Sequence, residues 1–339
     1  MIDGSRGDGW AWPAGSATGI GSLPGTDIVE AVKTVFGELP EFPYLPELPA
    51  RGPGADAIGR TGALLVDLPV ELYAARWRIA GRPGRDLRRA HDLRERDLDA
   101  LTEEAAEFAG PVKAQAVGPW TLAAALELPY GGPVLRDPGA VRDLAASLAE
   151  GLRAHVAELR ARLPEAGLLL QLDEPSLPAV LAGRVPTESG FGTLPAVEPG
   201  TAVGALRSIV DAVGVPVVVH CCAADVPLRL LRDAGAAAVA VDLDLARDLD
   251  ALGEVLDGGL GLLAGAAGTM ARRVPSSADI ASRVRRLWRD LSLPFDRMPA
   301  QVVVTPACGL AGASPEYARA VQAACREAGR RLADEPEAG

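Results

Sequence analysis

The sequence predicts an α/β fold, a single-domain (β/α)₈ TIM barrel, from its short apolar runs, the helical segments between them and its length. Runs bounded by turn residues read as strands at 17–21, 42–48, 112–117, 168–172, 215–219, 237–241, 260–264 and 301–305. Segments rich in Ala, Leu, Arg and Glu lie between most of them, as at 143–163 and 314–335. Strands that alternate with helices pair in parallel, and 339 residues suit one closed barrel of eight such units.

The elements differ in how clearly the sequence defines them. The first two strands are the least regular, because ATGIG and FPYLPEL contain Gly or Pro. The segment at about 49–110 is longer than a simple crossover, so we expect a helical insertion with its amphipathic part at 86–108. Residues 1–16 are expected to be a flexible N-terminal segment, followed by one barrel over 17–335. His91 and His155 lie in charged helical segments and are expected to be solvated.

Composition excludes several classes of partner. A net charge of −11 argues against a nucleic-acid or anionic-membrane surface, which would need basic patches. The N-terminus lacks the basic-then-apolar pattern of a signal peptide, and four cysteines in a long chain do not suggest a disulfide framework. We therefore expect a cytoplasmic protein with free thiols and no nucleic-acid or membrane partner.

Polar and thiol residues stand at or just beyond the carboxyl ends of several predicted strands. In a barrel these ends gather on one rim, where active sites form. Residues far apart in the chain would therefore meet there, and the candidates are Ser22, Glu47, Asp173, Glu174, His220, Cys222, Asp242, Asp244 and Cys308.

The stretch VPVVVHCC, at 215–222, suggests a metal site. His220 and Cys222 are two residues apart, so on a strand they project the same way, while Cys221 points into the packing. Together with Cys308 and a carboxylate from the strand at 237–241, they would form a set of zinc ligands. The alternative is an ordinary strand end with satisfied polar groups. Cys308, at another strand end, favours the metal, whereas Cys325 sits in a helical pattern typical of core.

Five motifs, in this order and strand context, carry a resemblance to a known family. They are GSLP (21–24), LDEP (172–175), HCC (220–222), VDLD (241–244) and TPACGLAG (305–312). Over about residues 17–330 the chain resembles the catalytic C-terminal barrel of cobalamin-independent methionine synthase. The resemblance implies methyl transfer to the thiol of homocysteine, in methionine biosynthesis, with Zn²⁺ binding that thiol as a thiolate. The implied donor is 5-methyltetrahydrofolate or a methyl-corrinoid protein.

The resemblance also assigns roles to single residues. It implies zinc ligation by His220, Cys222 and Cys308, with Asp242 as the fourth ligand and Asp244 as its alternative. The family has a glutamate at this fourth position, and aspartate is one methylene shorter.

At the substrate's amino-acid end, the resemblance implies that Ser22 and Asp173 hold the carboxylate and the ammonium, with Glu47 as a further substrate-binding residue. Asp173 is the expected catalytic residue, because it would fix the position of the reacting sulfur. The competing role for Asp173 is that of a helix N-cap.

Two features depart from the family pattern. The full-length family carries a second, N-terminal barrel that helps to hold the folate, and we expect none in this chain. Beyond its seventh strand the family has Asp-x-His, whose histidine is proposed to protonate the departing folate. Residues 264–277, AGAAGTMARRVPSS, contain neither histidine nor carboxylate. Methyltetrahydrofolate would then be a poor donor, because its leaving nitrogen needs a proton.

Two further functions remain open. A metal-free barrel enzyme like uroporphyrinogen decarboxylase would need a basic cleft, for which the rim offers only Arg51, Arg60 and the pair Arg272 and Arg273. It would also leave the Cys/His set unexplained. A non-catalytic zinc-binding barrel is the third candidate. A coordination position that accepts a thiol would separate it from the methyltransferase.

Overall fold

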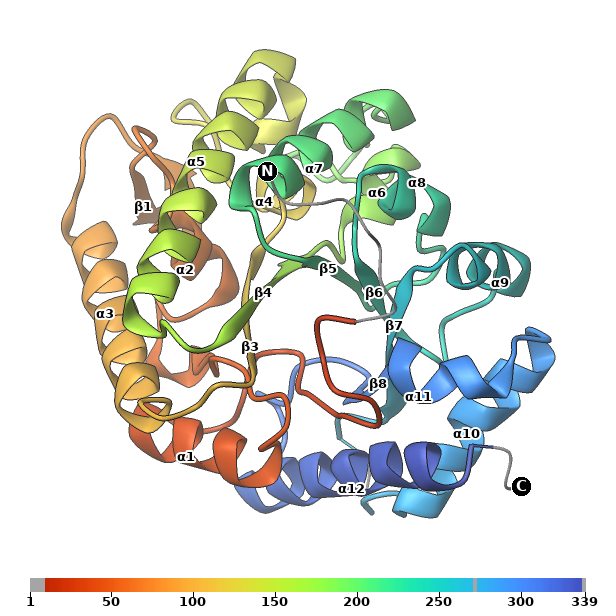
Figure 1. The fold of residues 1–339 in the computed structure, drawn as a ribbon. Helices are drawn as coiled ribbons and strands as arrows, with labels where there is room; N and C mark the ends of the chain where they lie inside the picture. The colour runs from red at the N-terminus through yellow and green to blue at the C-terminus, as the bar shows by residue number, and fades with distance from the viewer. Residues whose placement is uncertain (1–9, 271–272, 337–339) are drawn as a thin grey trace, which may run out of the picture.

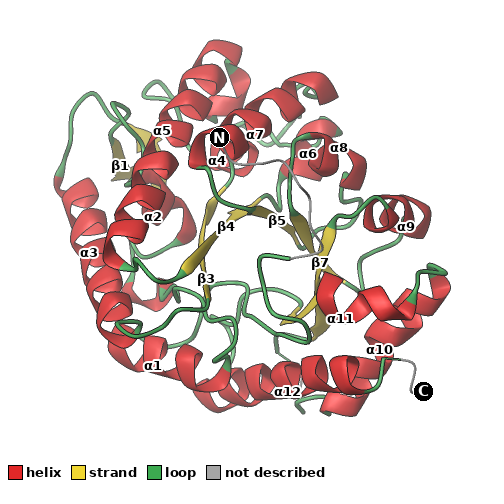
Figure 2. Cartoon of the chain, in the orientation of Figure 1, coloured by secondary structure: helices red, strands yellow, loops and turns green. Residues whose placement is uncertain are grey.

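The computed structural model describes residues 10–270 and 273–336. Within them a six-stranded parallel sheet, ordered β3-β4-β5-β6-β7-β8, curls around a centre and is covered by helices on its outer face (Figures 1 and 2). Its strands are β3 (Pro111–Val117), β4 (Gly167–Asp173), β5 (Val217–Cys221), β6 (Ala238–Asp242), β7 (Gly261–Ala267) and β8 (Val302–Pro306). They confirm six of the predicted strands.

Several of the outer helices begin at an Asp or Ser whose side chain accepts hydrogen bonds from first-turn backbone N–H groups, as Asp137 does before α5 and Ser314 before α12. In the described part of the chain, none of these helices has the length and apolar character needed to cross a membrane. The helices are α1 (Ile28–Glu38), α2 (Ala57–Gly62), α3 (Arg85–Glu104), α4 (Pro119–Ala125), α5 (Pro138–Arg162), α6 (Leu177–Leu181), α7 (Pro199–Val213), α8 (Leu228–Asp233), α9 (Leu249–Asp257), α10 (Ser277–Asp290), α11 (Met298–Gln301) and α12 (Pro315–Asp334), with 3₁₀ turns η1 (Pro49–Arg51), η2 (Val134–Arg136) and η3 (Phe295–Arg297).

The predicted strands at 17–21 and 42–48 are single bridges, not regular strands. Glycine interrupts the first segment and proline the second, which removes side chains or donors that a ladder needs. The bridges nevertheless run in order from β8 to β3. They join Ala17 to Val304, Ser22 to Glu47 and Tyr44 to Lys113, all in parallel. A regular eight-stranded barrel is therefore not confirmed and stays a prediction.

The insertion at about 49–110 contains the expected helices and one element that the sequence did not predict. An antiparallel hairpin of β1 (Val70–Tyr73) and β2 (Arg76–Ile79) lies between α2 and α3. Its turn residues, Ala74 and Ala75, have φ of 46° and 64°, a region that alanine rarely adopts. The turn therefore lacks the Gly or Asn signal from which a hairpin could be read.

Residues 10–16 are packed against the ring, although residues 1–16 were expected to be flexible; residues 1–9 lie outside the described part. Trp12 is buried and stacks on Phe42, with ring centroids 6.4 Å apart. Its indole N–H donates to the Ala300 carbonyl at 3.0 Å. At Gly261, where β7 begins, an added Cβ would lie 2.5 Å from the Trp12 ring. Burial of this large aromatic surface holds the segment in place.

His155 is also packed in a way that the sequence did not predict. It lies in α5, 5% exposed, with Nδ1 3.3 Å from a guanidinium nitrogen of Arg94. Burial, together with the Arg94 charge, lowers the pKa of His155 to about 4. His91, by contrast, is exposed as expected.

We expect His155 to make the fold acid-sensitive. Below pH ~6.5 His155 binds a proton in the unfolded chain, whereas in the folded chain it stays neutral until about pH 4. The free energy of unfolding therefore falls across this window by up to roughly 3 kcal/mol. His155→Asn, whose amide oxygen can accept from Arg94, should flatten the fall in urea midpoint between pH 7 and pH 4.5. His91→Asn is the control and should keep the wild-type slope. Parallel pH profiles for wild type and His155→Asn would contradict the assignment.

Candidate metal and substrate site

Three of the predicted metal ligands lie together at the carboxyl ends of β5 and β8. One ligand atom each of His220, Cys222 and Cys308 lies within 4.8 Å of the other two. The two sulfur atoms are 3.3 Å apart, and the Cys308 Sγ is 3.7 Å from the His220 Nε2. The curl of the sheet thus joins residues that are far apart in the chain, as their strand-end positions predicted.

This donor set fits a zinc ion. Around tetrahedral zinc, two sulfur ligands lie about 3.8 Å apart and a sulfur and a nitrogen about 3.6 Å apart. Both observed separations are within half an ångström of these values. The His220 Nδ1 lies 3.2 Å from the Ala240 carbonyl, so as a donor it leaves the Nε2 lone pair facing the thiols. The neighbouring Cys221 is fully buried in the packing, as expected.

The two thiols are electrostatically unequal. The contact with Cys222, and then that with His220, lowers the pKa of Cys308 although burial opposes this. The same contact, together with burial, raises the pKa of Cys222. One thiol therefore ionises readily while its neighbour keeps the proton, a state that suits replacement of that proton by a metal ion.

The predicted fourth ligand does not join this group. Asp242, the last residue of β6, is half-buried and accepts a hydrogen bond from the Asp244 backbone N–H at 2.9 Å. Burial raises its pKa, and the charges of Asp244 and Cys308 add to this. The alternative, Asp244, is exposed and pairs with Arg283 at 2.6 Å. Ligation by Asp242 stays a prediction.

Asp173 and Glu174, adjacent in sequence, have different surroundings. Asp173 pairs in register with His220 across β4 and β5, which sets its side chain beside the candidate ligands. Burial raises the pKa of Asp173, and its Oδ1 accepts from the Gln171 amide at 2.7 Å. Glu174 is fully buried, and its carboxylate accepts from the backbone N–H groups of Trp120 and Thr121 at 2.9 and 2.8 Å. Glu174 thus accepts from first-turn N–H groups of α4, whereas the N-cap of α6, the helix that follows β4, is Ser176. The capping role considered for Asp173 is therefore not seen.

Ser22 lies at the same rim. An added Cβ at Gly309 would be 2.1 Å from the Ser22 Oγ, so the hydroxyl sits against the residue that follows Cys308. The Ser22 carbonyl also accepts from the Leu310 N–H at 2.7 Å. Glu47, bridged to Ser22, is buried and forms an ion pair with Arg60 at 3.3 Å. The glycine allows the close approach that brings the serine to the candidate metal ligands.

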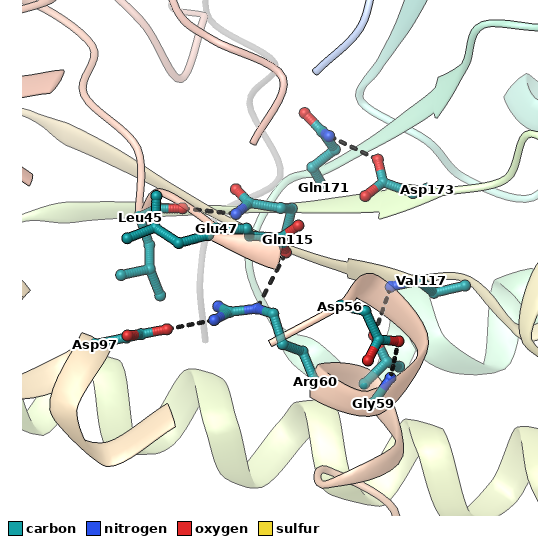
Figure 3. A network of polar contacts seen from close by, with 12 residues as sticks. Leu45, Glu47, Asp56, Gly59, Arg60, Asp97, Gln115, Val117, Gln171 and Asp173 are labelled. Carbon is teal, nitrogen blue, oxygen red and sulfur yellow. Dashed lines mark hydrogen bonds and ion pairs between the residues drawn. The ribbon is translucent and has the colours of Figure 1, made fainter. Parts of the chain in front are cut away.

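A buried polar network, part of which Figure 3 shows, was not predicted from the sequence. Asp97 is fully buried and accepts from both Arg51, at 2.6 and 2.9 Å, and Arg60. Lys113 is fully buried, and burial lowers its pKa. The sequence contains a pattern that indicates part of this network. Polar residues occupy alternate positions of apolar strands, at 113 and 115 and at 171 and 173. In a parallel strand covered on both faces, that period of two indicates the interior face.

Comparisons with known proteins bear on the family and the fold of this chain. Residues 15–330 match the family described as cobalamin-independent synthase, catalytic domain. A B12-independent methionine synthase from Shewanella sp. W3-18-1, solved in complex with selenomethionine, has a similar fold. Its TM-score is 0.63 at 12% identity, with 95% of this chain and 98% of that chain covered. A GH113 beta-mannanase from Alicyclobacillus acidocaldarius matches with a TM-score of 0.44 at 12% identity, covering 95% of this chain and 98% of that one.

Comparison with curated proteins finds no match. The family match, in contrast, spans nearly the whole chain and includes every strand of the curled sheet and each predicted site residue. The chain belongs to the family of cobalamin-independent methionine synthase catalytic domains.

Proposed function

We propose that this protein is a zinc-dependent methyltransferase that transfers a methyl group to the thiol of homocysteine, in methionine biosynthesis. The observation that carries the proposal is the meeting of His220, Cys222 and Cys308 at the rim where Asp173 also lies. A thiol-activating centre and an anchor for an ammonium group thus stand side by side. A cytoplasmic setting, in which thiols stay reduced, is part of this proposal.

His220, Cys222 and Cys308 would hold the zinc, with Asp242 as the proposed fourth protein ligand. Zinc, when bound, supplies the Lewis acidity that keeps a substrate thiol ionised at neutral pH, although free thiols have a pKa near ~8.5. The substrate sulfur would be an added or exchanged ligand, as catalytic zinc sites permit.

The chain's own side chains would orient the substrate. The Asp173 carboxylate pairs with the substrate ammonium, and the Ser22 hydroxyl donates to its carboxylate, with Glu47 as a further contact. Two fixed anchors at one end of a short molecule fix the position of its sulfur at the other end, which gives the methyl donor a defined line of approach.

The rival functions fit the contacts less well. A decarboxylase acting on a polycarboxylate would need cations at the rim, but Arg51 and Arg60 are engaged by Asp97 and Glu47. Of the other two candidate cations, Arg273 is exposed and Arg272 lies outside the described residues. A non-catalytic zinc barrel would bind the metal without binding a thiol. Thiol binding therefore decides between the remaining two candidates.

We expect one zinc per chain in the wild type and loss of that zinc in Cys308→Ser, measured as metal content of the purified proteins. X-ray absorption at the zinc edge should show an added sulfur ligand when homocysteine is present. The matched control is Cys221→Ala, which removes the neighbouring thiol that points into the packing and should keep its zinc. Wild-type protein without zinc would contradict the proposal, and zinc without an added sulfur would favour the non-catalytic barrel.

Asp173→Asn should keep its zinc but bind homocysteine more weakly by about 10- to 100-fold, because an ammonium loses its charged partner. Titration calorimetry on the zinc-loaded protein measures this. The Glu174→Gln variant provides the contrast. It should lower the urea midpoint, since Glu174 accepts bonds from two buried N–H groups, and leave homocysteine affinity unchanged. Equal affinities for wild type and Asp173→Asn would remove Asp173 from the substrate site.

The methyl donor should be a corrinoid rather than a folate. Transfer from methylcobalamin leaves the cobalt with the bonding electron pair and needs no proton, whereas folate departs only when its nitrogen is protonated. Residues 264–277 contain no histidine or carboxylate to supply that proton, and such an acid contributes about 10²–10⁴-fold. Methylation of homocysteine should therefore be faster with methylcobalamin than with 5-methyltetrahydrofolate by about that factor. Equal rates would show that another group supplies the proton, and Cys308→Ser serves as the blank for both donors.

A further inference from the structure

The two segments that bridge β8 to β3 carry proposed substrate-binding residues without a regular strand to hold them. Ser22 stands in the first and Glu47 in the second, and single bridges join each to its neighbours. Their positions therefore depend on contacts other than a backbone ladder. Besides single backbone hydrogen bonds, such as that from the Leu23 N–H to the Glu47 carbonyl at 2.8 Å, these contacts come from side chains inside the ring.

The first segment is held at one carbonyl group. The ammonium of Lys113 donates to the Ile20 carbonyl at 3.1 Å, and the Gln171 amide donates to the same oxygen at 2.8 Å. Ile20 precedes Ser22 by two residues. Two donors, one from β3 and one from β4, thus fix the backbone just before the serine.

The second segment is held in the same way. The Gln115 amide donates to the Leu45 carbonyl at 2.6 Å, and Leu45 precedes Glu47 by two residues (Figure 3). The Gln115 Oε1 accepts a hydrogen bond from Lys113 at 3.3 Å, so the hydrogen bonds that hold the two segments are connected. All the donors are nine-tenths or more buried, so water does not compete for these bonds.

Gln171 connects the hydrogen bonds at the Ile20 carbonyl to Asp173. Its Nε2 uses one proton on the Ile20 carbonyl and the other on the Asp173 carboxylate at 2.7 Å (Figure 3). An amide orients the carboxylate without neutralising it, so the charge that an ammonium needs is kept. The Gln171 Oε1 is buried and has no partner among the described residues, which costs stability. Stabilisation alone therefore does not account for this amide.

We propose that Gln171, supported by Lys113 and Gln115, is a positioning residue that fixes the spacing between Ser22 and Asp173. This spacing selects a thiol that carries an α-amino acid end over a thiol that lacks one. The inference rests on the proposed function, because it assumes that Ser22 and Asp173 hold that end of the substrate.

The test measures selectivity rather than turnover. Calorimetry on zinc-loaded protein compares homocysteine with 2-mercaptoethanol, a thiol that has neither ammonium nor carboxylate. Gln171→Met removes both donors and the unpaired oxygen while keeping the length of the side chain. We expect its Kd for homocysteine to rise by about tenfold or more and its Kd for 2-mercaptoethanol to be unchanged.

The chain offers a matched control in Gln301. This residue is 1% exposed, donates to the Leu256 and Leu260 carbonyls at 2.6 and 2.8 Å, and likewise has an unpaired Oε1. It lies just before β8, at the opposite end of that strand from Cys308. Gln301→Met should change thermal stability and leave both Kd values unchanged. If Gln171→Met behaves like Gln301→Met, or weakens both thiols equally, the positioning role is overturned.

A second variant covers failure of the first to fold. Gln115→Met removes the hydrogen bond to the Leu45 carbonyl and should produce the same selective loss of affinity for homocysteine. If neither variant alters the ratio of the two Kd values, the inference fails while the proposed function stands. If zinc-loaded wild type binds 2-mercaptoethanol and homocysteine equally well, the selectivity itself is absent and the inference fails. If it binds neither, the proposed function fails as well.

Discussion

The parallel register between β4 and β5 is the constraint on which the rest of the site depends. It sets Asp173 beside His220, and the alternation of side chains then sends His220 and Cys222 toward the rim and Cys221 into the packing. A slip of one residue would exchange these orientations and present a single thiol in place of an imidazole and a thiol. The valines that precede His220 would stay buried after such a slip, so they do not fix the register. A slip would instead move the His220 imidazole into the apolar packing that now surrounds Cys221, which is costly.

The candidate ligands were predictable because the signal is local. A β-branched run defines β5, and the residues at its end reach the rim whichever helices surround it. The same logic identified Cys308 at the end of β8. Asp242 is different, since its contacts depend on how the chain turns after β6, and the turn takes its carboxylate as a hydrogen-bond acceptor. The strand pattern of the sequence does not predict such a turn.

Three other features needed the structure. The hairpin of β1 and β2 uses alanines at its turn, Trp12 packs through contacts with distant residues, and His155 of α5 is buried beside Arg94 of α3. Each depends on tertiary neighbours that a residue's own segment does not reveal. The interior polar residues were predictable in part. The period of two predicts that Lys113, Gln115 and Gln171 share the interior face. Only the structure shows that they donate to backbone carbonyls rather than being left free to contact substrate.

The aromatic packing at the other end of the ring has a kinetic consequence. Trp12 and Phe42 pack with Leu169, Val218 and Val303, inward residues of the strands, so that end is closed by apolar side chains. In the proposed reaction both substrates would then approach from the carboxyl ends of the strands, where the described site residues lie. An amino acid held by Asp173 and Ser22 would then be covered by a donor that follows it from the same side. Such a geometry imposes an order of events, with the acceptor first to enter and its methylated product last to leave.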